Sequence, residues 1–219
     1  MSEARHAILA RIRQATRRQA SAEASEALAA QRLAQHPRGP LPAFAETAVT
    51  RFIHKLQQAS ASVISVDSLD AAVPAIDAYL QQHGLPRRLV TAAAPLLNDL
   101  AWPGDYAVEQ RLATAADPVV LSVAFAGIAE TGTLALLSGS ETPTSLNFLP
   151  DDYICLLQQQ DLVSHMEEVW ERIRARPGGM PRTLNYISGP SRTADVEQTI
   201  QLGAHGPRRL LVILVNNGG

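Results

Sequence analysis

The sequence of 219 residues contains only one cysteine, Cys155. A single cysteine excludes an internal disulfide, a CxxC pair and an iron–sulfur cluster held by this chain alone. Cys155 lies in the apolar run Tyr153–Leu157, which predicts a buried structural thiol. Because a chain with a single cysteine forms no internal disulfide that would require an oxidising environment, we expect a cytoplasmic protein.

Long apolar runs and an excess of one charge are also missing. No run approaches the ~18 apolar residues that a membrane helix requires, so we expect no membrane span. The N-terminal residues lack the apolar segment of a secretory signal. The net charge of −2 gives no reason to expect nucleic acid as a partner.

Several motifs that carry chemistry are absent from the sequence as well. The phosphate-binding patterns GxGxxG and GxxxxGK[ST] do not occur, and neither does the hydrolase pattern GxSxG. The histidines show no metal-ligand spacing with a carboxylate partner, so we expect no metal site and no cofactor in this chain.

What the sequence does contain is enough apolar material for a sizeable core, with 46% hydrophobic and 18% charged residues. The breaker His36–Pro42 separates two regions. Residues 1–42 are expected to form a helical arm with a basic first half and a proline-rich linker, packed on its own domain or on a partner. Residues 43–219 are expected to form the main domain.

The main domain alternates between β-branched runs and amphipathic helices, which is typical of an α/β fold with a largely parallel sheet. We expect strands at 62–66, 88–91, 106–110, 119–128, 133–137, 153–157, 183–188 and 209–215. We expect helices at 44–59, 69–83, 162–176 and 193–202, and a short helix or loop at 95–100.

The turn Ala129–Thr133 (AETGT) interrupts the most apolar stretch of the chain. A carboxylate between two core strands is costly unless it has a partner or a task, so Glu130 is a candidate base, nucleophile or ligand-orienting group. Gly132 would let the backbone approach a ligand closely. The alternative is a connecting turn whose Glu130 is paired with backbone amides or an arginine.

A second candidate is the segment 189–195 (GPSRTAD), which follows one predicted strand and opens a predicted helix. Ser191 and Thr193 are helix-capping residue types, and Arg192 with free helix amides would suit a carboxylate or phosphate. Such turns lie at the carboxyl edge of a parallel sheet. An ordinary capped helix is the alternative. By the same reasoning His205 would lie at the opposite, amino edge in a structural turn.

The segment Glu141–Pro150, which contains Thr144 and Asn147, follows the AETGT turn. Its hydroxyl and amide groups indicate either the wall of a pocket or a plain connection.

Three strings carry a resemblance to a known family: FAGIAETGTLALLSG, TPTSLNFLPDDYICLL and PRTLNYISGPSRTADVEQTIQLGAHGPRRLLVILV. They resemble the bacterial LUD-domain family of lactate-utilisation proteins, over roughly Ala43 to Val215. The resemblance implies the NagB/RpiA/CoA-transferase-like fold, a sheet flanked by helices. It implies an accessory subunit in the oxidation of L-lactate to pyruvate, with partner proteins that carry iron–sulfur clusters.

The resemblance also implies a set of distinctive family positions, although it does not assign a role to each of them. In this sequence they are Glu130, Thr131, Gly132, Thr133, Ser191, Arg192, Thr193, Asp195, His205 and Gly206. Relatives often carry a histidine where this chain has Tyr153, which removes that proton-transfer group here.

Three hypotheses follow for the function. In the first, the accessory subunit binds a small carboxylate or a partner at the sheet edge, with Glu130 as the candidate catalytic group. The substrate-binding candidates are then Thr131, Gly132, Thr133, Thr144, Ser191, Arg192 and Thr193. The second is a stand-alone enzyme acting on an acyl-CoA or sugar phosphate, and the third is a non-catalytic regulatory module. The sequence leaves open whether the chain catalyses a reaction by itself.

Overall fold

The computed structural model describes residues 3–15, 22–193, 201–203 and 205–216. The chain divides into two units, Met1–Leu41 and Pro42–Gly219. The first unit contains helices α1 (Glu3–Ala15) and α2 (Ala22–Gln35). In these helices the apolar side chains of Ile8, Ile12, Leu28 and Leu33 are exposed.

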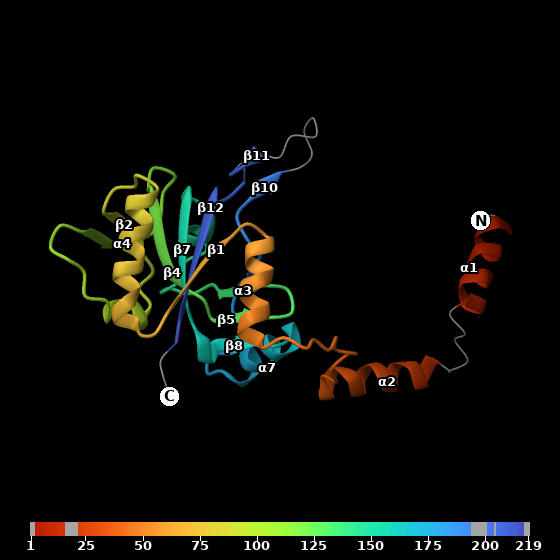
Figure 1. The fold of residues 1–219 in the computed structure, drawn as a ribbon. Coiled ribbons are helices and arrows are strands. Elements are labelled where there is room, and N and C mark those ends of the chain that lie inside the picture. The colour runs from red at the N-terminus through yellow and green to blue at the C-terminus, as the bar shows by residue number, and fades with distance from the viewer. Residues whose placement is uncertain (1–2, 16–21, 194–200, 204, 217–219) are drawn as a thin grey trace. The chain divides into compact units, whose positions relative to one another are not determined.

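The second unit is built on a six-stranded sheet in the order β1-β12-β7-β4-β2-β3 (Figure 1). Every neighbouring pair in this sheet is parallel, as the alternation of strands and helices predicts. The central strands are continuous apolar runs because both of their faces are covered. The strands are β1 (Ser62–Val66), β2 (Arg88–Thr91), β3 (Ala107–Gln110), β4 (Val119–Val123), β7 (Asp152–Gln158) and β12 (Arg209–Val215).

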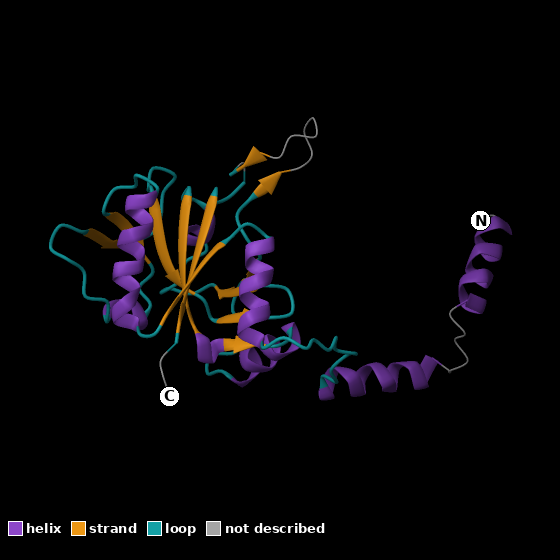
Figure 2. Ribbon diagram, in the orientation of Figure 1, coloured by secondary structure: helices purple, strands orange, loops and turns teal. Residues whose placement is uncertain are grey.

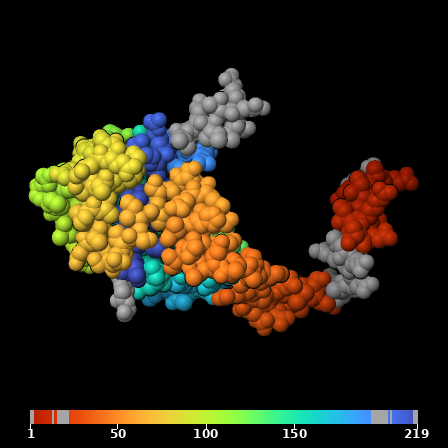
Figure 3. Space-filling model, viewed as in Figure 1, coloured from red at the N-terminus to blue at the C-terminus, as the bar shows by residue number. Residues whose placement is uncertain are grey.

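Helices pack along this sheet (Figure 2), and Figure 3 shows the outer faces of α3 and α4 in the space-filling view. The helix α3 (Ala48–Gln58) begins at Thr47, whose hydroxyl accepts a hydrogen bond from the N–H of Thr50 (3.2 Å). Phe52 and Leu56, one turn apart, are completely buried. The other helices along the sheet are α4 (Ala72–Gln82), α5 (Pro95–Asn98) and α6 (Ser145–Phe148), with single 3₁₀ turns at Leu69–Ala71 and Gln159–Asp161.

A second sheet of four strands, in the order β8-β5-β6-β9, was not expected from the sequence. The predicted strand 119–128 is wrong as a single element, because it divides into β4 in the first sheet and β5 (Ala126–Ile128) in the second. Strands β5 and β6 (Thr133–Leu137) form the antiparallel hairpin around the AETGT turn, and β9 (Leu184–Ile187) pairs antiparallel with β6. A smaller core joins this sheet to helix α7 (Met166–Ala175).

Two predicted helices need correction. The segment 162–176 begins with the short strand β8 (Leu162–Val163), which pairs with β5, and only then turns into α7. The predicted helix 193–202 is wrong at both described ends, because β10 (Arg192–Thr193) pairs antiparallel with β11 (Gln201–Leu202). Residues 194–200, including the predicted first helical turn with Asp195, lie outside the described residues.

Candidate functional site

The two candidate turns pack against the same element, the C-terminal turn of α3. Gly132 has φ +64°, and a Cβ on it would lie 2.5 Å from Lys55 Cβ and 2.6 Å from the Leu56 nitrogen. Gly189 has φ +109°, and a Cβ there would lie 2.5 Å from the carbonyl oxygen of Ala59. Both glycines are therefore needed because the backbone approaches a helix, and Gly132 serves packing at the position where we expected approach to a ligand.

Glu130 points to a histidine that we did not connect with it from the sequence. Its Oε2 lies 3.2 Å from Nδ1 of His165, the N-cap residue of α7. The backbone N–H of His165 in turn donates to Oε1 of Glu168 (2.9 Å), which closes a capping box. The guanidinium of Arg51 donates to the Glu130 carbonyl oxygen (3.4 Å). The Glu130 carboxylate is therefore paired, but with a histidine and not with the backbone amides or the arginine that we expected for a structural turn.

The hydroxyls of the same turn form a chain toward another segment. Thr131 Oγ1 lies 2.6 Å from Thr133 Oγ1, and Thr133 Oγ1 lies 2.5 Å from Ser188 Oγ. Thr133 is buried, whereas Thr131 is exposed. These three hydroxyls therefore connect the AETGT turn to the end of β9, where Ser188 lines a cavity.

This cavity, of about 330 Å³, lies where β9 ends and β7 and β12 begin, at the amino edge of the six-stranded sheet. Its volume is within the range of ligand pockets. The described residues that line it are Asn147, Phe148, Tyr153, Tyr186, Ile187, Ser188, Gly189, Pro190, Ser191, His205, Gly206, Pro207 and Leu210.

The prediction that His205 and the GPSRT segment lie at opposite edges is wrong. The N–H of Ser191 donates to the carbonyl of Pro207 (2.8 Å), and the N–H of Gly203 donates to the carbonyl of Ser191 (3.1 Å). The physical reason is that β9 belongs to the second sheet and runs antiparallel to its partner β6. Its carboxyl end therefore reaches the amino edge of the first sheet, beside the turn that precedes β12.

The floor of the cavity is a buried polar network. The Tyr153 hydroxyl donates to Oδ1 of Asn147 (3.1 Å) and contacts the hydroxyl of Ser122. Asn147 is 5% exposed, Tyr153 is 1% exposed and Ser122 is 2% exposed. Burial raises the pKa of the Tyr153 phenol well above its ordinary value. Burial also raises the pKa of the neighbouring Cys155 thiol to about 12, so this thiol is a structural group and not a nucleophile.

An ion pair lies beside this network, at the first residues of β7 and β12. Arg209 binds Asp152 through two hydrogen bonds of 2.6 Å, and the Tyr79 hydroxyl donates to Asp152 Oδ1 (2.8 Å). Asp152 is 1% exposed. Its hydrogen bonds raise the pKa of the Arg209 guanidinium, while burial and then the Asp152 carboxylate raise the pKa of Tyr79. This network fixes β7 against β12, the strands that supply Tyr153 and Leu210 to the cavity.

Three predicted site residues take other positions. The Arg192 guanidinium is exposed and donates to the Ser60 hydroxyl at the end of α3. Thr144 precedes α6, where its carbonyl accepts from the N–H of Asn147 (3.0 Å). Thr193 lies in β10. Among the described lining residues, Ser191 is therefore the predicted substrate-binding residue that reaches the cavity.

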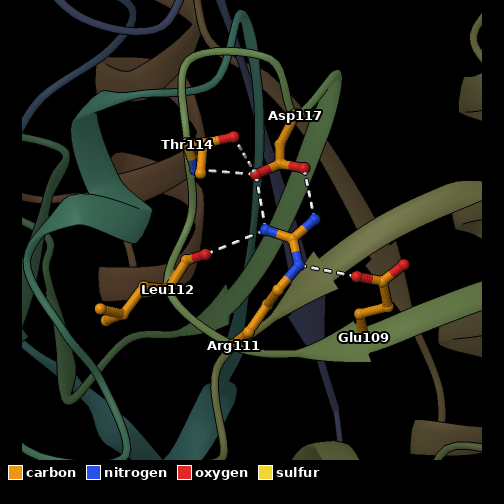
Figure 4. A network of polar contacts seen from close by, with 5 residues as sticks. All are labelled: Glu109, Arg111, Leu112, Thr114 and Asp117. Atoms are coloured by element: carbon orange, nitrogen blue, oxygen red, sulfur yellow. Dashed lines mark hydrogen bonds and ion pairs between the residues drawn. The ribbon is translucent and has the colours of Figure 1, made fainter.

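The segment between the end of β3 and the start of β4 carries a different polar network (Figure 4). Arg111, which follows β3, donates to both oxygens of Asp117 (2.8 and 2.6 Å) and to Glu109 Oε2 (2.6 Å). Asp117 is 3% exposed. Hydrogen bonds from Arg111, followed by those from Thr114, hold the pKa of this carboxyl well below its usual value against the effect of burial. The guanidinium is thus engaged in structural bonds, although Arg111 lines a smaller cavity of about 240 Å³.

In the described part of the chain, no group of three or more His, Cys, Asp or Glu side chains is arranged to hold a metal ion. None of the described helices is both long enough and apolar enough to cross a membrane.

Several known proteins have sequences similar to this one. The model of the LUD domain matches residues 107–215. A lactate utilization protein C from Halalkalibacterium halodurans is 30% identical over 170 residues, which cover 75% of this chain and 71% of that protein. A lactate utilization protein C from Bacillus subtilis is 30% identical over 146 residues, covering 64% of this chain and 60% of that protein. The match therefore spans less than two thirds of the Bacillus protein.

Among solved structures, a DUF162-family protein from Deinococcus radiodurans superimposes with a TM-score of 0.56 at 24% identity, covering 80% of this chain and 99% of that one. This likeness supports the α/β fold, a mostly parallel sheet flanked by helices. The chain belongs to the LUD-domain family, as the sequence segments predict.

Proposed function

We propose that this chain serves lactate utilization as an accessory protein and binds a small carboxylate in the cavity at the amino edge of the sheet. The role in lactate utilization is supported by the names of the relatives from Halalkalibacterium halodurans and Bacillus subtilis. The single observation that carries the binding site is the convergence of three segments on one cavity: Asn147–Phe148, Ser188–Ser191 and His205–Pro207. All three lie within two of the three strings that carry the family resemblance.

The chemistry of the cavity suits a small oxygen-rich anion. The imidazole of His205, the hydroxyls of Ser188 and Ser191 and the carboxamide of Asn147 supply polar groups, and the phenols of Tyr153 and Tyr186 line the same cavity. Since the sequence contains no nicotinamide or flavin motif, we propose that the electrons of lactate oxidation pass to partner proteins with iron–sulfur clusters. This division of labour fits a chain whose only cysteine is buried.

Glu130 remains the candidate for a proton-transfer group in this proposal, but its contacts favour a structural role. Its carboxylate faces His165, and the described lining of the cavity does not include it. The second candidate function is an enzyme that forms a covalent adduct on Glu130. The position of Glu130 does not favour it, because the carboxylate faces His165 and is not among the described residues that line the cavity.

A thermal-shift panel on the purified chain tests the proposal. L-lactate, D-lactate, pyruvate, acetyl-CoA, a sugar phosphate and sulfate would each be added to the same concentration series. A ligand at ~100 times its Kd adds about 2.7 kcal/mol to the free energy of unfolding. We expect a concentration-dependent rise of Tm with lactate or pyruvate. A rise with acetyl-CoA or the sugar phosphate alone would contradict the proposal.

A genetic test addresses the partners. A strain that lacks its own lactate utilization protein C would be complemented with this chain, and growth on L-lactate as sole carbon source would be measured. We expect growth to return and the tagged chain to co-purify with iron–sulfur proteins. Full growth of the strain without any copy would contradict a role in lactate utilization.

A further inference from the structure

Asn147 has an unused hydrogen-bonding group in an almost closed environment. The residue is 5% exposed and lines the cavity. Its Oδ1 accepts a hydrogen bond from Tyr153, whereas its Nδ2 has no acceptor among the described residues. A donor on the wall of a cavity takes its acceptor from whatever fills that cavity, water or a ligand. The missing acceptor is therefore expected from outside the described chain, on the side of the cavity.

The orientation of the Asn147 carboxamide is set by its hydrogen bond from Tyr153. The phenol of Tyr153 has one proton, and it donates that proton to Oδ1 of Asn147. The Tyr153 oxygen can then accept from the Ser122 hydroxyl, whose proton also has Cys155 Sγ within reach at 4.0 Å. Both hydroxyls are buried, so water does not compete for them. The hydroxyl chain Ser122–Tyr153 thus holds Oδ1 toward the floor and leaves Nδ2 as the group that is offered to a ligand.

We propose that Asn147 determines the specificity of the cavity by donating from Nδ2 to an oxygen of a small 2-oxo or 2-hydroxy carboxylate. Tyr153 and Ser122 act as positioning residues that fix the donor. This inference rests on the proposed function, because it takes the ligand from there. A donor amide selects acceptor oxygens and rejects cationic groups, so an amino compound of the same size would be a poor ligand.

The experiment is isothermal titration calorimetry of the whole chain with pyruvate and with L-lactate, using wild type, Asn147→Asp, Tyr153→Phe and Asn185→Asp. The Asn147→Asp side chain keeps its shape and can still accept from Tyr153, but it loses both donors and gains a charge. We expect its Kd for pyruvate at pH 7 to rise at least about tenfold, the scale of a charge-assisted hydrogen bond.

The pH profile separates this role from a structural one. Burial raises the pKa of a carboxyl, so the introduced aspartic acid should regain a proton donor as the pH falls from 7 to 5. We expect the ratio of the variant Kd to the wild-type Kd to shrink over this range. A variant that binds poorly because it is loosely folded would show no such recovery.

Tyr153→Phe keeps the size of the floor residue and serves if Asn147→Asp does not fold. Without the phenol, the carboxamide is free to rotate, and we expect a Kd about threefold higher, in line with the loss of one neutral hydrogen bond. Asn185→Asp is the matched control, because it makes the same chemical change at a residue that does not line the cavity, where Nδ2 is buried and unpaired among the described residues. Its Kd should stay within about twofold of wild type.

The outcomes distinguish the inference from the function on which it rests. Wild type that binds pyruvate or lactate, together with Asn147→Asp and Tyr153→Phe that bind equally well, overturns the inference and leaves the proposed function intact. Wild type that binds neither acid overturns both. A loss of affinity in Asn185→Asp as large as in Asn147→Asp would assign the effect to folding and also contradict the inference.

Discussion

The AETGT turn and the cavity at the amino edge of the sheet differ in how they use their polar groups. In the turn, the Glu130 carboxylate faces His165, and Gly132 allows close packing on α3. In the cavity, Asn147 offers an amide donor that no described residue accepts. In the turn, the Glu130 carboxylate is paired within the chain. In the cavity, the Asn147 amide is available to a ligand.

This difference teaches that a carboxylate in an apolar sequence is a weaker sign of function than an unpaired donor in a cavity. The cost of burying Glu130 is offset by a partner 35 positions along the chain. At Asn147 the Tyr153 hydroxyl occupies Oδ1, and the rest of the carboxamide is available to whatever fills the cavity. The predictions below test whether the two regions divide structure and binding in this way.

The largest effect is expected for Gly132→Ala. An alanine at φ +64° is strained, and its Cβ would lie only 2.5 Å from Lys55 Cβ and 2.6 Å from the backbone nitrogen of Leu56. Backbone strain and overpacking together should lower the free energy of unfolding by about 3–4 kcal/mol. Urea denaturation measures this change.

Gly139→Ala is the matched control for that substitution. Gly139 has no left-handed φ, and the nearest atom to its added Cβ would be Thr142 Oγ1 at 3.6 Å. Its stability should remain within about 0.5 kcal/mol of wild type. If Gly132→Ala were as stable as this control yet failed to support growth on lactate, the turn would be a functional site and the comparison would fail.

A smaller effect is expected for Asp117→Asn, which shows what the loss of a purely structural carboxylate looks like. The variant loses the ion pair with Arg111 and should be about 2 kcal/mol less stable at pH 7. Because the folded-state pKa of Asp117 lies below its unfolded value near 3.9, its contribution is present above about pH 4 and declines as the pH falls below that.

Denaturation curves between pH 7 and pH 3 check this prediction. The stability difference between wild type and Asp117→Asn should be constant at the upper end and should narrow toward pH 3. A difference that widened on acidification would show that the carboxyl is not stabilised by Arg111.

The smallest effect is expected for Glu130→Gln. The glutamine retains an oxygen that accepts from His165, and the pair is partly exposed, so the loss should be about 0.5–1 kcal/mol. Growth on lactate of a strain carrying this variant should be unchanged. Abolished growth with a stability near wild type would make Glu130 a catalytic residue.

Much of the fold follows from local sequence pattern. The parallel strands are continuous apolar runs, whereas the helix that we expected at 44–59 begins at Ala48, after the N-cap residue Thr47. The second sheet does not follow, because the chain changes sheets without a Gly or Pro signal. The N–H of Ala124 donates to Leu156 in the first sheet, and the N–H of Phe125 donates to Ala135 in the second. Only the long-range partners decide that a single apolar run becomes two strands.

The candidate site was predictable in its segments but not in its assembly. For the segment Glu141–Pro150 we left open a pocket wall or a plain connection, and its residues Asn147 and Phe148 line the cavity. The residues of the GPSRT segment favour a helix cap by type, but the pairing of Arg192 with Leu202 places the described ends in strands. Ser188 was missed because its contact with Thr133 joins positions 55 residues apart, and no local pattern marks it.

The central claim is that the small carboxylate binds in the cavity at the amino edge of the sheet and not at the AETGT turn. Calorimetric titration of pyruvate into His205→Ala and Glu130→Gln, beside wild type, tests it most directly. His205 lines the cavity, so its loss should raise the Kd at least about fivefold, whereas Glu130→Gln should stay within about twofold. Affinity that is lost in Glu130→Gln and preserved in His205→Ala would contradict the account.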